Sequence, residues 1–165
     1  MTENARTRAY AARRNAARLA AVQALYQMEI SGRGASAVVR EFVDDRLVEE
    51  GEAAEELDAE HLRALVEGVV AAQDEVDARI TGVLAQGWKL KRLDATARAI
   101  LRAGAYEILR RGDIPPAVAV DAYVGIARAF FDGPEPGFIN AALDTLAKAG
   151  AQRSPPGAAD ETASG

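Results

Sequence analysis

The amino-acid sequence predicts an all-α protein of about seven helices. Apolar residues recur at helical spacing along almost the whole chain, and the two-residue alternation typical of a half-buried strand is absent. Glycine and proline stand between the apolar runs, where helices end and begin. The length of 165 residues suits one compact domain. We therefore expect a single helical domain over residues 1–150, with subdomains at about 7–87 and 94–149.

Four helices are expected in the first half of the chain. The first spans roughly residues 7–30, carries apolar residues on one face, and ends at Ser31-Gly32. The second covers about 35–49. The third begins after Asp58, because a carboxylate there can cap the first free N–H groups of a helix. The fourth follows it directly.

Three helices are expected in the second half. Asp94 can cap the fifth helix. Pro115 and Pro116 open the sixth, where the missing N–H of proline costs nothing, and Pro136 opens the seventh in the same way. Residues 151–165 contain no large apolar side chain, so a disordered tail is expected there.

The composition removes most catalytic chemistry. Cysteine is absent and His61 is the only histidine, so disulfides, thiolate metal sites and a cysteine nucleophile are excluded. No glycine-rich phosphate loop and no metal-ligand spacing is found. No apolar run approaches the roughly 20 residues of a membrane span, and no signal peptide is recognised. The sequence thus predicts a cytoplasmic protein that is not an enzyme and needs no cofactor or metal.

The charges are segregated along the chain, although the net charge is -5. Residues 1–20 carry five arginines and one glutamate, and residues 79–111 are also mainly basic. The segment between them, 41–77, is strongly acidic. A folded chain of this kind can present a local basic face to phosphate groups. On a helical wheel Arg14 and Arg18 share a face beside the apolar stripe, where a solvated surface is the alternative.

Several motifs follow one another in an order that matches a known family. They are RRNAAR leading into AVQALY (13–26), Trp88, ILRAGAYE (100–107), IPPAVAV (114–120) and FINAALD (138–144). In these motifs the chain resembles the NusB family of transcription antitermination factors. The resemblance covers about residues 13–148.

The resemblance implies both a fold and a function. NusB proteins are built as two three-helix bundles. They bind the boxA element of nascent ribosomal RNA together with a ribosomal protein that acts as NusE, within the antitermination complex of RNA polymerase. Members of the family are monomers or homodimers, and no membrane takes part.

The same resemblance implies five RNA-binding residues: Arg13, Arg14 and Arg18 in the first helix, and Phe138 and Asn140 in the last. Their chemistry suits the task, because guanidinium groups bind phosphate, aromatic rings stack on bases, and amides bond base edges. A phenylalanine beside a helix start is also a common core residue, which is the alternative for Phe138.

Tyr26 and Arg102 are the expected contacts to the protein partner. The alternatives are a core aromatic for Tyr26 and a salt-bridged structural residue for Arg102. Trp88 and Tyr106 are assigned to packing.

Four positions depart from the family pattern: Ala97, Ala122, Gly125 and Gly137. Ala97 stands where the family often has an acidic residue near the contact to its partner. Ala122 and Gly125 replace part of an acidic motif of the sixth helix, and Gly137 replaces a usual lysine beside the RNA motif. We expect weaker partner or RNA contacts at these positions. Two other functions stay open, namely the NusB-like N-terminal domain of an RNA cytosine methyltransferase and a protein-interaction module without RNA contact.

Overall fold

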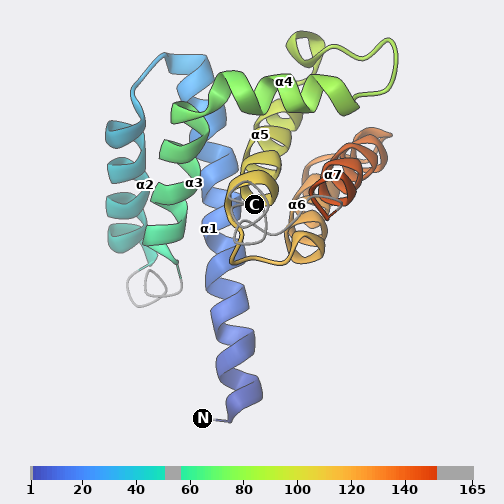
Figure 1. The fold of residues 1–165 in the computed structure, drawn as a ribbon. Coiled ribbons are helices and arrows are strands. Elements are labelled where there is room, and N and C mark those ends of the chain that lie inside the picture. The colour runs from blue at the N-terminus through green and yellow to red at the C-terminus, as the bar shows by residue number, and fades with distance from the viewer. Residues whose placement is uncertain (1, 51–56, 152–165) are drawn as a thin grey trace, which may run out of the picture.

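The computed structural model describes residues 2–50 and 57–151, which form seven α-helices, one short 3-10 helix and no strand (Figure 1). The elements are α1 (Glu3–Ser31), α2 (Ala35–Glu50), α3 (Ala59–Ala71), α4 (Gln73–Val83), η2 (Leu90–Arg92), α5 (Ala95–Arg110), α6 (Pro116–Phe130) and α7 (Glu135–Ala151). The predicted all-α class and the number of helices are confirmed. The tail predicted at 151–165 lies outside the described residues, apart from Ala151 at the end of α7.

Local capping chemistry sets most helix boundaries. Asp58 and Asp94 accept hydrogen bonds from the backbone N–H groups of the first turns of α3 and α5, at 3.0 and 2.8 Å. Gly32 ends α1 in the left-handed region with φ 74°. The expected start of α1 was one turn late, because the hydroxyl of Thr2 caps the helix by accepting from the N–H of Ala5 at 3.1 Å.

The helices form two groups of three. α1, α2 and α3 pack on one another, and so do α5, α6 and α7. The groups meet where α5 packs against α1 and α3, while α4 crosses one end of the molecule and contacts α5 and α7 (Figure 1). One continuous apolar core runs through both groups. Its largest fully buried aliphatic residues are Leu62, Leu65, Ile80, Ile100, Leu101, Ile139, Leu143 and Leu146.

The N-terminal half of α1 extends beyond the rest of the bundle (Figure 1). Its residues are exposed or only partly buried as far as Ala16, and Ala17 is the first that is fully buried. The arginine-rich segment therefore straddles the point at which α1 enters the core. This position gives neighbouring arginines very different surroundings.

Candidate nucleic-acid interface

Arg13 and Arg14 lie on the projecting part of α1, together with an exposed tyrosine. The guanidinium carbons of Arg14 and Arg13 are 5.0 and 6.0 Å from the ring centre of Tyr10, within the range of cation–π contacts. Tyr10 is 47% exposed. Sequence reasoning missed Tyr10, although its spacing of three and four residues before the two arginines places all three on one helix face. The cluster offers both cations and an aromatic face.

Arg14 also has a structural contact. Its Nε donates to Oδ2 of Asp58 at 3.4 Å, which ties α1 to the N-cap of α3. The pKa of Asp58 is lowered: burial would raise it, but the hydrogen bonds from the His61 backbone and from Arg14 outweigh burial. Arg13 is exposed and Arg14 is partly buried. Of the two, Arg13 is thus the more accessible to a phosphate group.

The expectation that Arg18 lies on an exposed basic face is wrong. Arg18 is 3% exposed, and its Nε donates to both carboxylate oxygens of Glu107 at 2.9 and 3.1 Å. Its Nη1 donates to Asn15 at 2.7 Å. The helical wheel placed Arg18 beside the apolar stripe but could not show that α5 covers that side of α1 with a carboxylate. A buried guanidinium must be paired, and Glu107 supplies the pair.

Glu107 is the centre of a buried polar network that joins four helices. It also accepts a hydrogen bond from the hydroxyl of Tyr123 at 2.7 Å, and Nε2 of His61 lies 3.6 Å from its Oε1. Burial alone would raise the pKa of Glu107, but the contacts from His61, Arg18 and Tyr123 outweigh it and lower the pKa to about 2. The carboxylate is therefore ionised in the folded protein at neutral pH.

His61 belongs to this network. Its Nδ1 is 3.3 Å from Nη1 of Arg111. Because a guanidinium can only donate, Nδ1 accepts and Nε2 carries the proton that faces Glu107. Within residues 2–50 and 57–151, no group of three or more histidine, aspartate or glutamate side chains is placed to hold a metal ion.

Phe138 and Asn140 lie on different sides of α7, so they do not form one surface patch. Phe138 is partly buried against the core and stacks on Trp88, with ring centres 4.8 Å apart and an angle of 17° between the planes. Trp88 is 45% exposed. The assignment of Trp88 to packing is therefore only half right, because one face of the indole is covered and much of the ring is not.

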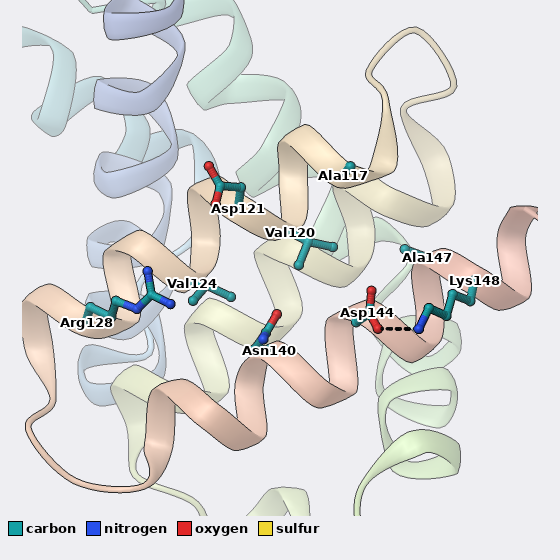
Figure 2. A pocket seen from close by; sticks show the side chains of 9 residues that line it. All are labelled: Ala117, Val120, Asp121, Val124, Arg128, Asn140, Asp144, Ala147 and Lys148. Carbon is teal, nitrogen blue, oxygen red and sulfur yellow. Dashed lines mark ion pairs between the residues drawn. The ribbon is translucent and has the colours of Figure 1, made fainter.

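Asn140 lines a pocket of about 410 Å³ between α6 and α7 (Figure 2). Arg128 and Lys148 lie along the same pocket, and Lys148 is paired with Asp144 at 2.9 Å (Figure 2). Ala117 and Asp121 line both this pocket and the neighbouring groove that contains Arg14. Asn140 and Arg14 are thus reached from adjacent hollows that share Ala117 and Asp121 of α6.

Tyr26 and Arg102 have separate surroundings. Tyr26 is 41% exposed and not in the core, and it lines an apolar groove with Ile30 and Phe130. Arg102 holds Asp77 with two hydrogen bonds of 2.8 and 2.9 Å, and it lies 3.4 Å from a carboxylate oxygen of Glu29. The geometry of Arg102 fits the salt-bridged alternative.

The four departures from the family pattern fall in different environments. Ala97 is buried, so it offers no surface to a partner. Ala122 lines the groove between α1 and α6. Gly125 and Gly137 are exposed, with open space where a side chain would begin.

No helix in the described part of the chain is long and apolar enough to cross a membrane.

Comparison with known proteins identifies the family. The model of the NusB family matches residues 15–148. The transcription antitermination protein NusB of Maricaulis maris is 56% identical over 137 residues, which cover 82% of this chain and 86% of the relative. The NusB protein of Caulobacter vibrioides is 53% identical, covering 82% of this chain and 92% of the relative.

Solved structures agree with this result. NusB of T. maritima superposes with a TM-score of 0.68 at 31% identity, covering 82% of this chain and 90% of that one. A NusB chain solved with NusE and double-stranded RNA has the same fold, with a TM-score of 0.68 at 24% identity, over 82% of this chain and 96% of that one.

Proposed function

Because this chain belongs to the NusB family, we propose that it is a transcription antitermination factor that binds boxA-type RNA together with a ribosomal protein acting as NusE. The observation that carries the proposal is the 56% identity to an antitermination protein over 86% of that protein's length. The same coverage favours this function over that of a methyltransferase domain. The proposed activity is binding and needs no catalytic group.

The RNA surface that we propose differs from the one expected from the sequence. It begins on the projecting part of α1 with Arg13, Arg14 and Tyr10, and it continues past α6 to Asn140. Cations there would bind phosphates while the tyrosine stacks on a base. Arg18 contributes indirectly, because its pair with Glu107 fixes α1 against α5.

For the protein partner we propose the apolar groove at the C-terminal end of α1. Tyr26, Ile30 and Phe130 are all exposed around it. Exposed aromatic residues beside a groove are frequent anchors of protein interfaces. Arg102 supports this region by holding α5 to α4 and is not itself the anchor. Tyr26→Ala should therefore weaken partner binding and leave the affinity for RNA alone nearly unchanged.

The proposal is tested by titrating a labelled boxA-like RNA with the full chain, with and without the partner protein, at several salt concentrations. The affinity should fall as salt rises, since each phosphate contact releases counterions. Arg13→Glu should weaken binding by about tenfold at low salt, because it reverses one exposed contact. Arg63→Glu, on the exposed side of α3, is the matched control and should change the affinity for RNA little.

Two outcomes would contradict the proposal. If the chain bound the partner protein but bound no RNA even in its presence, the chain would be an interaction module without RNA contact. If Arg13→Glu and Arg63→Glu weakened binding equally, the RNA would respond only to overall charge, and the surface on α1 would be wrong.

A further inference from the structure

Besides Tyr10 on α1, a second aromatic side chain is exposed near the proposed RNA-binding residues of α7, namely Trp88. The indole stacks on Phe138 with ring centres 4.8 Å apart, yet it remains 45% exposed. Phe138 in turn packs against the core. Because Phe138 covers one face of the indole, the exposed area lies on the opposite face and the edges. The pair therefore presents an open aromatic face that is backed by the fold.

The segment that carries Trp88 is held in place by its neighbours. Leu90, the first residue of η2, and Leu93, the residue that follows η2, are buried. Arg98 of α5 donates from Nη1 to the backbone carbonyls of Leu90 and Leu93 at 2.9 and 2.8 Å. Gly87, with φ 93°, allows the turn in which the N–H of Trp88 bonds to the carbonyl of Ala85 at 3.0 Å. The platform is thus anchored before any ligand arrives.

The segment that carries Trp88 is basic, and the nearest acids along the chain are Asp77 before it and the exposed Asp94 after it. Residues 78–93 contain four basic residues and no acidic one, although the whole chain carries a net charge of -5. Lys89, Lys91 and Arg92 are exposed, and their side chains form no ion pair with any other residue that the structure describes. This contrasts with Arg98, Arg102 and Arg110, each of which is paired with a carboxylate. Glu135 is the one acid in the first turn of α7, three residues before Phe138 in the sequence.

An open aromatic face beside unpaired cations fits one ligand chemistry. Single-stranded RNA combines exposed bases, which stack on aromatic rings, with phosphates that lysine and arginine neutralise. A protein partner would need acidic side chains placed opposite all three cations, Lys89, Lys91 and Arg92, whereas RNA carries a phosphate at every nucleotide. We propose that Trp88, supported by Phe138, is a stacking platform for one base of single-stranded RNA, and that Lys89, Lys91 and Arg92 contact the flanking phosphates.

This inference rests on the proposed function but goes beyond it. Nothing in the RNA surface on α1 and α6 requires Trp88 or the basic residues of η2. The projecting part of α1 and the segment after α4 lie at different ends of the molecule (Figure 1), whereas Asn140 is two residues from Phe138 on α7. A bound transcript would therefore contact the protein at two separated places, and Phe138 would act as the support of the platform and not as its outer face.

The direct test uses the fact that Trp88 is the only tryptophan in the sequence. Intrinsic fluorescence of the full chain should be quenched on addition of boxA-like RNA, with the same midpoint as binding measured by anisotropy of a labelled RNA. When the partner protein is included, the Trp88→Phe chain measured in the same way gives the background fluorescence to be subtracted. A midpoint that differs from the binding midpoint, or no quenching at saturation, overturns the proposal.

Substitutions give a second, independent test. Trp88→Ala should lower RNA affinity by about fivefold or more, the usual effect of removing one stacking base contact, while Trp88→Phe retains most of the affinity. The two variants should show similar thermal unfolding, which separates binding from folding. Equal affinities for the wild type and Trp88→Ala would overturn the platform.

The cations are tested by a matched pair of double variants. Lys89→Gln/Lys91→Gln should reduce the slope of log affinity against log salt by about 1.4, since each phosphate contact to a single strand contributes about 0.7. Arg40→Gln/Arg63→Gln removes the same charge from exposed positions of α2 and α3 and should leave the slope nearly unchanged. Equal slopes for both double variants would contradict the phosphate contacts. If RNA still binds in that case, the proposed function stands and only this inference fails.

Discussion

Arg18 and Glu107 show how two charges are kept inside this protein. They are 89 positions apart in the sequence, and neither is exposed to solvent by more than a few per cent. Their attraction offsets the loss of hydration only while both partners are present and fully hydrogen-bonded. Tyr123 and His61 complete the surroundings of the carboxylate. Removing one charge should therefore be far more damaging than removing an exposed pair.

Glu107→Gln should destabilise the protein by about 3 to 5 kcal/mol, because it leaves the buried guanidinium of Arg18 without a counter-charge. Urea denaturation followed by circular dichroism measures the change. Glu75→Gln is the matched control: Glu75 pairs with Arg110 at the surface, and its loss should change the free energy of unfolding by less than about 1 kcal/mol. Equal effects would show that the network is not important for stability.

The same carboxylate predicts an acid dependence of stability. The pKa of Glu107 is lowered from 4.5 to about 2 in the folded protein. Its contribution of about 3 kcal/mol is therefore complete above the pKa of the unfolded chain and is lost as the pH falls from about 5 towards 2. The free energy of unfolding measured across that range should decrease less steeply in Arg18→Met/Glu107→Leu/Tyr123→Phe than in the wild type. Parallel curves would contradict the assignment.

At the scale of helices, the close contact between α3 and α5 depends on one glycine. A β-carbon built on Gly68 would lie 2.1 Å from Cζ of Tyr106, far inside van der Waals contact. Tyr106 is partly buried against the core, as the sequence suggested. The absence of a side chain at Gly68 thus lets the ring of Tyr106 in α5 lie directly on the backbone of α3.

Gly68→Ala should lower the free energy of unfolding by about 1 to 3 kcal/mol, because the ring or the helix must shift. Gly82→Ala in α4 meets only open space, and it should stabilise the protein by about 0.5 to 1 kcal/mol through the lower entropy of the unfolded chain. Thermal unfolding of the two variants compares them directly. A destabilising effect of Gly68→Ala that persists when Tyr106 is also changed to alanine would contradict the proposed clash.

Helix boundaries could be predicted from the sequence because they depend on local chemistry. Asp58, Asp94, Gly32 and the prolines act on their own helix ends, whatever the rest of the chain does. The state of Arg18 could not be predicted, since its partner is distant in sequence and the helical wheel gives a face but not what covers it.

The candidate site was predicted less well for the same reason. Arg13 and Asn140 are exposed and Arg14 is partly buried, and their roles in RNA binding remain predictions. The exposure of Trp88 depends on how the turn at Gly87 positions the indole relative to α7. The hydrophobic periodicity of the sequence carries no information about that position. That Lys89 and Lys91 have no ion-pair partner among the described residues also follows only from the fold.

At the scale of the whole molecule, the acidic segment and the cations of the proposed RNA surfaces lie on different helices, although Asp58 pairs with Arg14 where α3 meets α1. The described residues of this segment, 41–50 and 57–77, belong to α2, α3, the start of α4 and the residues that join them. α2 packs on α1 and α3, away from α6 and α7 (Figure 1). The exposed cations of the proposed RNA surfaces lie on the first half of α1 and around η2. A chain of net charge -5 can thus attract RNA locally while the acidic helices repel it elsewhere.

The most direct test of this account is an NMR map of backbone and arginine side-chain signals of the full chain as boxA-like RNA is added. We predict shifts for residues 10–14 and 87–92, little change along α2, and an unchanged Nε–H signal for the buried Arg18. Shifts concentrated on α2 and α3, or a strong shift of the Arg18 side chain without change at residues 10–14, would contradict it.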